Sequence, residues 1–140
     1  MEMNRIFLET NSYSRFARGD NHIKKQIENA DEIFVSVITL GELFLGFREG
    51  KREHENLRLL KAFLSEWKVK VVNVNKSTSW EYGKIKYDLR KAGKPIPEND
   101  IWIAAQVAET DSLLVTYDKH FLDIKGLKVW KKLIGKRSKF

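Results

Sequence analysis

Four carboxylates stand beside the ends of predicted secondary-structure elements, where they could act together. They are Glu9, Glu42, Asp100 and Asp118. Taken singly, each has an ordinary explanation as a helix cap, a strand-end acid or a complement to a helix dipole. In one cleft they would repel one another, and a divalent cation would remove that repulsion. Because the chain has no cysteine and no paired histidines, its oxygen ligands favour Mg²⁺ or Mn²⁺ over Zn²⁺.

Short apolar runs that alternate with helical patterns must position these acids. The predicted strands are Arg5–Glu9, Ile33–Val37, Val69–Val74, Leu113–Thr116 and a fifth near Leu127–Trp130. Continuously apolar strands between helices indicate a parallel sheet covered on both faces. We therefore expect an α/β fold, a three-layer α/β/α sandwich with about five parallel strands. The length of 140 residues fits one domain, 1–140.

This topology brings the four acids to one edge of the sheet. Glu9 and Asp118 end the first and fourth strands, and ligands of such folds bind at that carboxyl edge. Asp100 begins a helix that runs antiparallel to the strands, so it starts at the same edge. Glu42 belongs to the helix after the second strand, where Thr39 and Glu42 have the spacing of a capping box.

The residues beside the acids have weaker assignments. Asn11, Asn99 and Thr116 are suitable partners for carboxylates or metal-bound water, and equally suitable for caps and turns. Thr10 and its two successors are helix-capping residue types. His120 is near enough to Asp118 to line a site, although a structural role is the favoured interpretation. Glu98 is interpreted as a dipole or surface charge.

The charge of the chain is concentrated at its end. The net charge is +7, and residues 125–140 hold seven lysines and arginines but no acid. The whole excess of basic over acidic residues therefore lies in this segment. This basic tail fits either a contact with a nucleic-acid backbone or a solvated terminus. No apolar run is long enough to span a bilayer, and the first residues lack the layout of a signal peptide. We expect a soluble, cytoplasmic protein.

Four motifs carry a resemblance to a known family. They are LETN at Leu8–Asn11, SVITLGEL at Ser36–Leu43, GKPIPENDIWIAA at Gly93–Ala105 and LLVTYDKHF at Leu113–Phe121. In order and spacing these resemble the PIN-domain ribonucleases, and more narrowly the VapC toxins of type II toxin–antitoxin pairs. The third motif is the most specific of the four.

The resemblance implies a Mg²⁺- or Mn²⁺-dependent endoribonuclease that hydrolyses RNA. Its catalytic acids would be Glu9, Glu42, Asp100 and Asp118. Glu9, Asp100 and Asp118 would bind the metal, and Glu42 would act through a water. The resemblance also implies a cognate VapB-like antitoxin that occupies the cleft, and a homodimer.

One position departs from the family pattern, which usually has aspartate where this chain has Glu9. The extra methylene displaces the carboxylate by about 1.5 Å, whereas catalytic groups tolerate errors of only about 0.5 Å. The alternatives are therefore a catalytically weakened RNA-binding module or an engineered low-activity toxin. A receiver-like signalling domain fits less well, because its third strand would need to end in an acid and here runs into Asn75.

The helix around Leu43 to Phe47 is apolar nearly all round. Such a helix is usually buried. Either the domain core covers it, or an antitoxin helix or a dimer mate covers part of it.

Overall fold

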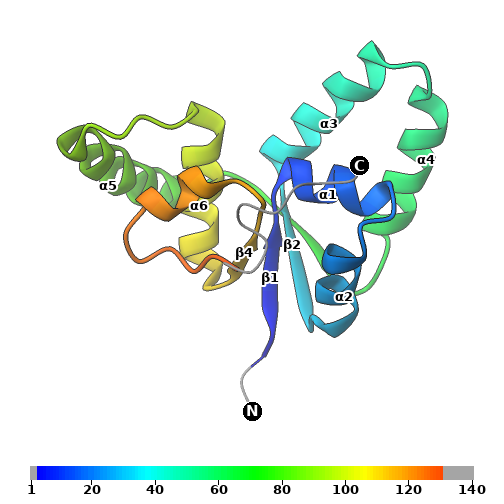
Figure 1. Cartoon of the computed structure of the whole chain (residues 1–140), viewed down its shortest axis with the longest axis horizontal. Coiled ribbons are helices and arrows are strands. Elements are labelled where there is room, and N and C mark those ends of the chain that lie inside the picture. The colour runs from blue at the N-terminus through cyan, green and yellow to red at the C-terminus, as the bar shows by residue number, and fades with distance from the viewer. Residues whose placement is uncertain (1–2, 131–140) are drawn as a thin grey trace.

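The computed structural model describes residues 3–130, and within them a parallel sheet forms the centre of the molecule (Figure 1). Its strands are β1 (Arg5–Leu8), β2 (Glu32–Ser36), β3 (Val69–Val72) and β4 (Leu113–Val115). The order across the sheet is β3-β2-β1-β4, and every neighbouring pair is parallel. β1 therefore lies in the interior of the sheet, and the chain reverses its direction of travel across the sheet between β3 and β4.

Helices cover both faces of this sheet. They are α1 (Thr10–Ala17), α2 (Asn21–Asn29), α3 (Val37–Glu49), α4 (Glu53–Leu64), α5 (Lys76–Ala92) and α6 (Glu98–Thr110), followed by a short 3₁₀ turn, η1 (Lys119–Asp123). Figure 1 shows α5 and α6 on one side and α1 to α4 on the other. This arrangement confirms the predicted three-layer α/β class. No described helix has both the length and the hydropathy that crossing a membrane requires.

Successive residues of β1 pack into two separate hydrophobic cores, because side chains alternate between the two faces of a strand. Phe7 packs with the residues of α5 and α6. Ile6 and Leu8 pack on the opposite face, against the α2 residues Ile23 and Ile27. The side chains of Ile6, Phe7 and Leu8 are all fully buried. β1, which leads directly to Glu9, is thus packed against helices on both of its faces.

The predicted fifth strand forms only a single bridge. Val129 pairs in parallel with Leu114, where the Leu114 N–H donates to the Lys128 carbonyl at 2.8 Å and the Trp130 N–H donates to the Leu114 carbonyl at 2.9 Å. β4 has three residues, which leaves little strand for a longer ladder. The predicted basic tail lies mostly outside the described residues, which end at Trp130.

Two helix starts determine where candidate acids lie. α6 begins directly after Pro97, which places Asp100 in its first turn as predicted. α3 begins three residues earlier than a capping box with Thr39 as its cap predicts, because the Ser36 hydroxyl accepts the Ile38 N–H at 3.0 Å and caps it. The predicted capping box of Thr39 and Glu42 is therefore wrong. Glu42 lies in the second turn, where its carboxylate is not needed as a cap.

Candidate active site

A hollow of about 450 Å³ at the carboxyl edge of the sheet collects all four candidate acids. Its lining residues are Glu9, Thr10, Asn11, Glu42, Pro97, Glu98, Asn99, Asp100 and Asp118. They come from the end of β1, the first residues of α1, the second turn of α3, the start of α6 and the residue before η1. No lysine or arginine of the described part of the chain lines this hollow. Its chemistry is therefore that of closely placed carboxylates with neutral neighbours.

Glu9 is buried, with only 4% of its surface exposed. It caps α1: its Oε1 accepts the Ser12 backbone N–H at 2.8 Å and lies 3.1 Å from the Ser12 hydroxyl. The same hydroxyl lies 2.7 Å from the carbonyl oxygen of Val115, the last residue of β4. Ser12 thus fixes the Glu9 carboxylate against both the helix and the sheet. Sequence reasoning assigned the cap to the residues after Glu9, which was wrong.

Burial raises the pKa of Glu9 from 4.5 to about 7. Hydrogen bonds from Ser12 lower this pKa, and the nearby charge of Asp100 raises it. Near neutral pH a large fraction of Glu9 therefore carries a proton. A cation beside the carboxylate would favour its ionised form, which is the response expected of a metal-binding acid.

Thr10 connects Glu42 to this site. The Thr10 hydroxyl donates to Glu42 Oε1 at 2.6 Å and lies 3.1 Å from the Thr39 hydroxyl. Glu42 thereby joins α3 to the start of α1, 32 residues away in sequence. Sequence reasoning gave Thr10 no role in the site. The available signal was its position inside the same four-residue motif as Glu9.

The imidazole of His120 lies between two of the acids. Its Nε2 is 3.0 Å from Asp100 Oδ2, and its Nδ1 is 3.2 Å from Asp118 Oδ1. Each ring nitrogen thus lies within 3.2 Å of a carboxylate oxygen. The ring packs on Phe121 with 4.6 Å between ring centroids. Sequence reasoning favoured a structural role, and the structure places His120 in contact with both candidate metal acids.

Asp100 has an elevated pKa for several reasons. Burial raises it most, the charges of Glu42 and Asp118 raise it further, and His120 lowers it. The carboxylates of the hollow therefore affect one another as the sequence predicted. This mutual repulsion is the physical condition that a bound cation relieves.

The predicted supporting residues have different environments. Thr116 is buried, and its hydroxyl accepts the Asp118 backbone N–H at 3.0 Å, so it shapes the turn rather than a carboxylate. Asn11 and Asn99 line the hollow and are exposed. Glu98 also lines it, but its carboxylate accepts a hydrogen bond from Tyr82 and pairs with Lys86 Nζ at 2.6 Å.

The donor set suits Mg²⁺ or Mn²⁺, which prefer carboxylate oxygens. As the side chains stand in residues 3–130, no three histidine, aspartate or glutamate side chains converge on one possible metal position. His120 takes up the space between Asp100 and Asp118. The residues therefore fit a divalent cation by type and by shared location, provided that side chains rearrange when it binds.

Comparison with known proteins adds an independent observation. The family model for the PIN domain matches residues 6–127. Ribonuclease VapC2 of Haemophilus influenzae strain KW20 Rd is 34% identical over 89 residues, which cover 64% of this chain and 66% of that protein. Ribonuclease VapC1 of H. influenzae strain R2866 is 33% identical over 98 residues, 69% of this chain and 72% of that protein. The chain thus aligns with about two thirds of the length of these relatives.

Solved structures agree over more of the chain. VapBC-1 from nontypeable H. influenzae superposes with a TM-score of 0.79 and 26% identity, covering 89% of this chain and 96% of that one. VapBC2 from Rickettsia felis, solved with a DNA fragment from their promoter, superposes with a TM-score of 0.76 and 27% identity, covering 89% of this chain and 96% of that one.

Proposed function

The chain belongs to the PIN-domain family, and from this premise we propose that it is a divalent-metal-dependent endoribonuclease acting as the toxin of a toxin–antitoxin pair. The observation that carries the proposal is the convergence of Glu9, Glu42, Asp100 and Asp118 on one hollow. The names of the relatives, Ribonuclease VapC1 and VapC2, support an RNA substrate. The cytoplasm, where RNA is present, is its proposed place of action.

In this proposal Glu9, Asp100 and Asp118 hold Mg²⁺ or Mn²⁺, and Glu42 acts through a water. When bound, the cation supplies the Lewis acidity that activates water for attack on an RNA phosphodiester. Ser12 and Thr10 hold Glu9 and Glu42 in place through the hydrogen bonds described above. His120 leaves its present position between Asp100 and Asp118 when a cation takes the space.

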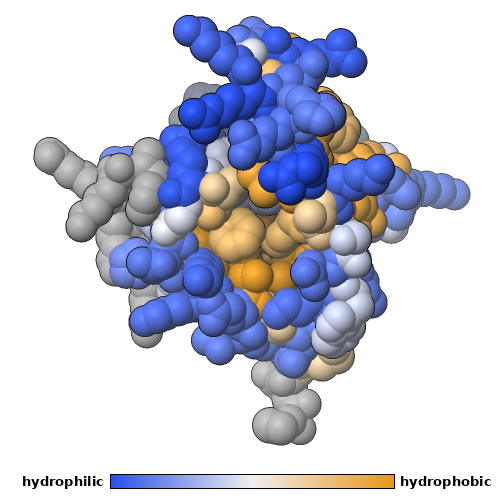
Figure 2. All heavy atoms as spheres, turned by 90° about the vertical axis from the view of Figure 1, so that its right-hand side faces the viewer, coloured by the Kyte–Doolittle hydropathy of each residue, from blue (hydrophilic) through white to orange (hydrophobic). Residues whose placement is uncertain are grey.

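The antitoxin is proposed to bind in a second hollow of about 590 Å³ between α1, α3 and α4. Thr10 and Glu42 line both hollows, so a partner lying there reaches the acids directly. The apolar lining of this second hollow includes Leu43, which is buried, and Leu59, which is 39% exposed. Figure 2 shows apolar residues gathered in a depression with a hydrophilic rim on this side. Such patches mark protein interaction sites. The homodimer stays a prediction.

A second candidate function is a weakened RNA-binding module. It is favoured by the position of Glu9, whose Oε1 is directed at Ser12 of its own helix. That contact occupies part of the carboxylate that a metal would need. Both candidates bind RNA, but only the nuclease cleaves it.

A cleavage assay separates the two. The full chain is incubated with a labelled RNA in Mn²⁺, with and without a chelator. Endonucleolytic products that disappear with the chelator support the nuclease. RNA that is bound but left intact in Mn²⁺ supports the weakened module.

A further inference from the structure

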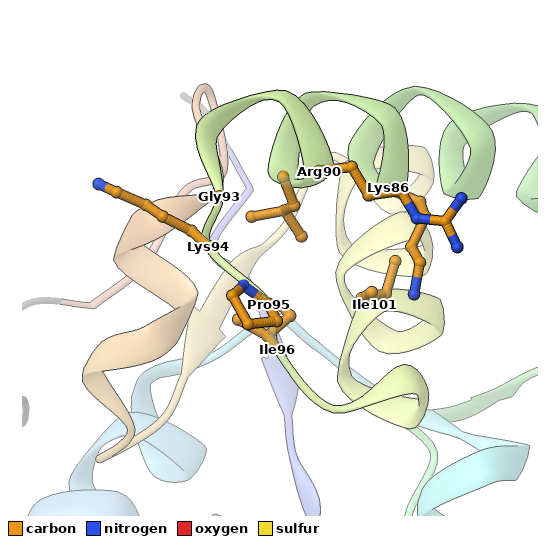
Figure 3. A pocket seen from close by; sticks show the side chains of 8 residues that line it. Lys86, Arg90, Gly93, Lys94, Pro95, Ile96 and Ile101 are labelled. Atoms are coloured by element: carbon orange, nitrogen blue, oxygen red, sulfur yellow. The ribbon is translucent and has the colours of Figure 1, made fainter.

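A third hollow lies where α5 meets α6, outside the acid site. Its volume is about 290 Å³, and it is lined by Lys86, Leu89, Arg90, Gly93, Lys94, Pro95, Ile96 and Ile101 (Figure 3). The side chains of Leu89, Ile96 and Ile101 are almost fully buried and form its apolar floor. Figure 3 shows Lys86 and Arg90 of α5 near Ile101, and Lys94 extending from the connecting loop. The hollow thus combines an apolar base with three cationic side chains.

The loop that shapes this hollow is preorganised. α5 ends at Gly93 in the left-handed conformation, with φ +66°. The Gly93 N–H donates to the Arg90 carbonyl at 3.2 Å, and the Lys94 N–H donates to the Leu89 carbonyl at 3.0 Å. These two bonds form a Schellman motif, which satisfies the last carbonyls of the helix. The following Pro95 restricts the backbone further, so little ordering is needed when a ligand binds.

The three cations differ in how far they are neutralised. Lys86 pairs closely with Glu98, and Lys94 Nζ lies 3.7 Å from Asp123 Oδ1. Arg90 is exposed and forms no ion pair with an acid among the described residues. A guanidinium presents a planar set of donors that matches phosphate oxygens. Arg90 is therefore the group best prepared to receive an anion.

This basic hollow and the acid hollow flank the same short segment. Pro95, Ile96 and Ile101 line the basic hollow, whereas the residues from Pro97 to Asp100 line the acid hollow. Among residues 3–130, the acid hollow offers no lysine or arginine to a polyanion. A substrate with many phosphates therefore needs cations close by, and the basic hollow supplies them on the adjoining side of α6.

We propose that the basic hollow binds a flanking nucleotide of the RNA strand whose phosphodiester enters the acid hollow. The base packs on the floor of Leu89, Ile96 and Ile101, and the phosphate contacts Arg90. This inference rests on the proposed function, since it assigns a second contact to the same substrate. An RNA strand is favoured over an acidic peptide because it brings an apolar base face together with a phosphate, which a guanidinium binds through two parallel hydrogen bonds.

The test measures binding rather than cleavage, so it is independent of catalysis. Fluorescence anisotropy in a chelating buffer follows a labelled single-stranded RNA with the full chain, Arg90→Gln and Lys84→Gln. Lys84 is the matched control because it lies on α5, is exposed and does not line the hollow. We expect Arg90→Gln to weaken binding about tenfold and to reduce the salt slope by about 0.7, the value for one phosphate contact on a single strand.

Two results overturn this inference. One is an equal affinity of Arg90→Gln and Lys84→Gln for RNA, with matching thermal unfolding of the two variants. The other is that Arg90→Gln weakens binding of a poly-glutamate peptide of the same charge as much as it weakens RNA binding. That result would make the hollow a site for acidic peptides. If Arg90→Gln weakens RNA binding but the full chain never cleaves, the inference stands and the nuclease proposal fails. If the full chain cleaves RNA but Arg90→Gln binds RNA as tightly as Lys84→Gln, this inference fails and the nuclease proposal stands.

Discussion

Glu9 and Ser12 hold each other at the first turn of α1, where Glu9 Oε1 accepts the Ser12 backbone N–H at 2.8 Å. The family pattern usually places an aspartate at this position. Aspartate also caps helices well and reaches the same amides with one methylene fewer. The cap is therefore compatible with both residues, while the position of the carboxylate differs between them.

The first prediction follows from this difference. Glu9→Asp should raise metal-dependent RNA cleavage by about tenfold or more, because a misplacement of about 1 Å can cost two orders of magnitude in rate. Initial cleavage rates in Mn²⁺ provide the measurement, and Glu28→Gln, an exposed change on α2, serves as the control. Equal or lower activity of Glu9→Asp would show that Glu9 does not limit the site.

The second prediction concerns stability against pH in metal-free protein. Burial raises the pKa of Glu9 to about 7 from 4.5, so between these values the folded state binds more protons than the unfolded state. Its contribution to stability is present below pH 4.5 and declines as pH rises to about 7. Glu9→Gln keeps an acceptor for Ser12 and removes the ionisation. Its stability relative to the natural chain should improve by about 3 kcal/mol between pH 4.5 and pH 8.

Urea unfolding with a chelator at both pH values measures this change. Glu28→Gln, an exposed change on α2, serves as the control. If the difference in unfolding free energy between Glu9→Gln and the natural chain is the same at both pH values, burial does not raise the pKa of Glu9 above its ordinary value of 4.5.

The third prediction concerns His120. Because its imidazole contacts both Asp100 and Asp118, it competes with a cation for them. His120→Ala should bind Mn²⁺ about tenfold more tightly or better, since even one contact to a charged group is worth about 1.5 kcal/mol. Isothermal titration calorimetry measures this affinity, with the exposed His54→Ala as control. Unchanged or weaker binding would mean that His120 positions the acids for the metal instead.

Local sequence signals predicted the parts of the site that depend on single elements. Pro97 and the apolar run behind it fixed the start of α6, so the place of Asp100 was predictable. The ends of the apolar runs placed Glu9 and Asp118 at one sheet edge. Both inferences need only backbone rules for prolines and parallel strands.

The side-chain contacts were not predictable in the same way. The bond from Thr10 to Glu42 joins segments 32 residues apart, and the position of His120 depends on how η1 packs against α6. The capping box at Thr39 failed because Ser36, three residues earlier, could cap the same helix. The sequence pattern alone does not determine which of two suitable residues caps the helix, because tertiary packing decides where the preceding strand ends.

We propose that the acids of this hollow bind a metal ion that supports RNA cleavage, and Asp100→Asn probes this role at a single carboxylate. The change keeps the shape of the side chain and removes one charge from a crowded set of carboxylates. We expect Mn²⁺-dependent cleavage to fall by about 10- to 100-fold or more, since even the outer partners of a metal site are worth that much, and Mn²⁺ binding to weaken in the same protein. Thermal unfolding should stay at or above the natural value, and the exposed control Asp88→Asn should keep full activity. An Asp100→Asn protein that cleaves RNA and binds Mn²⁺ as well as Asp88→Asn would mean that Asp100 does not bind the metal.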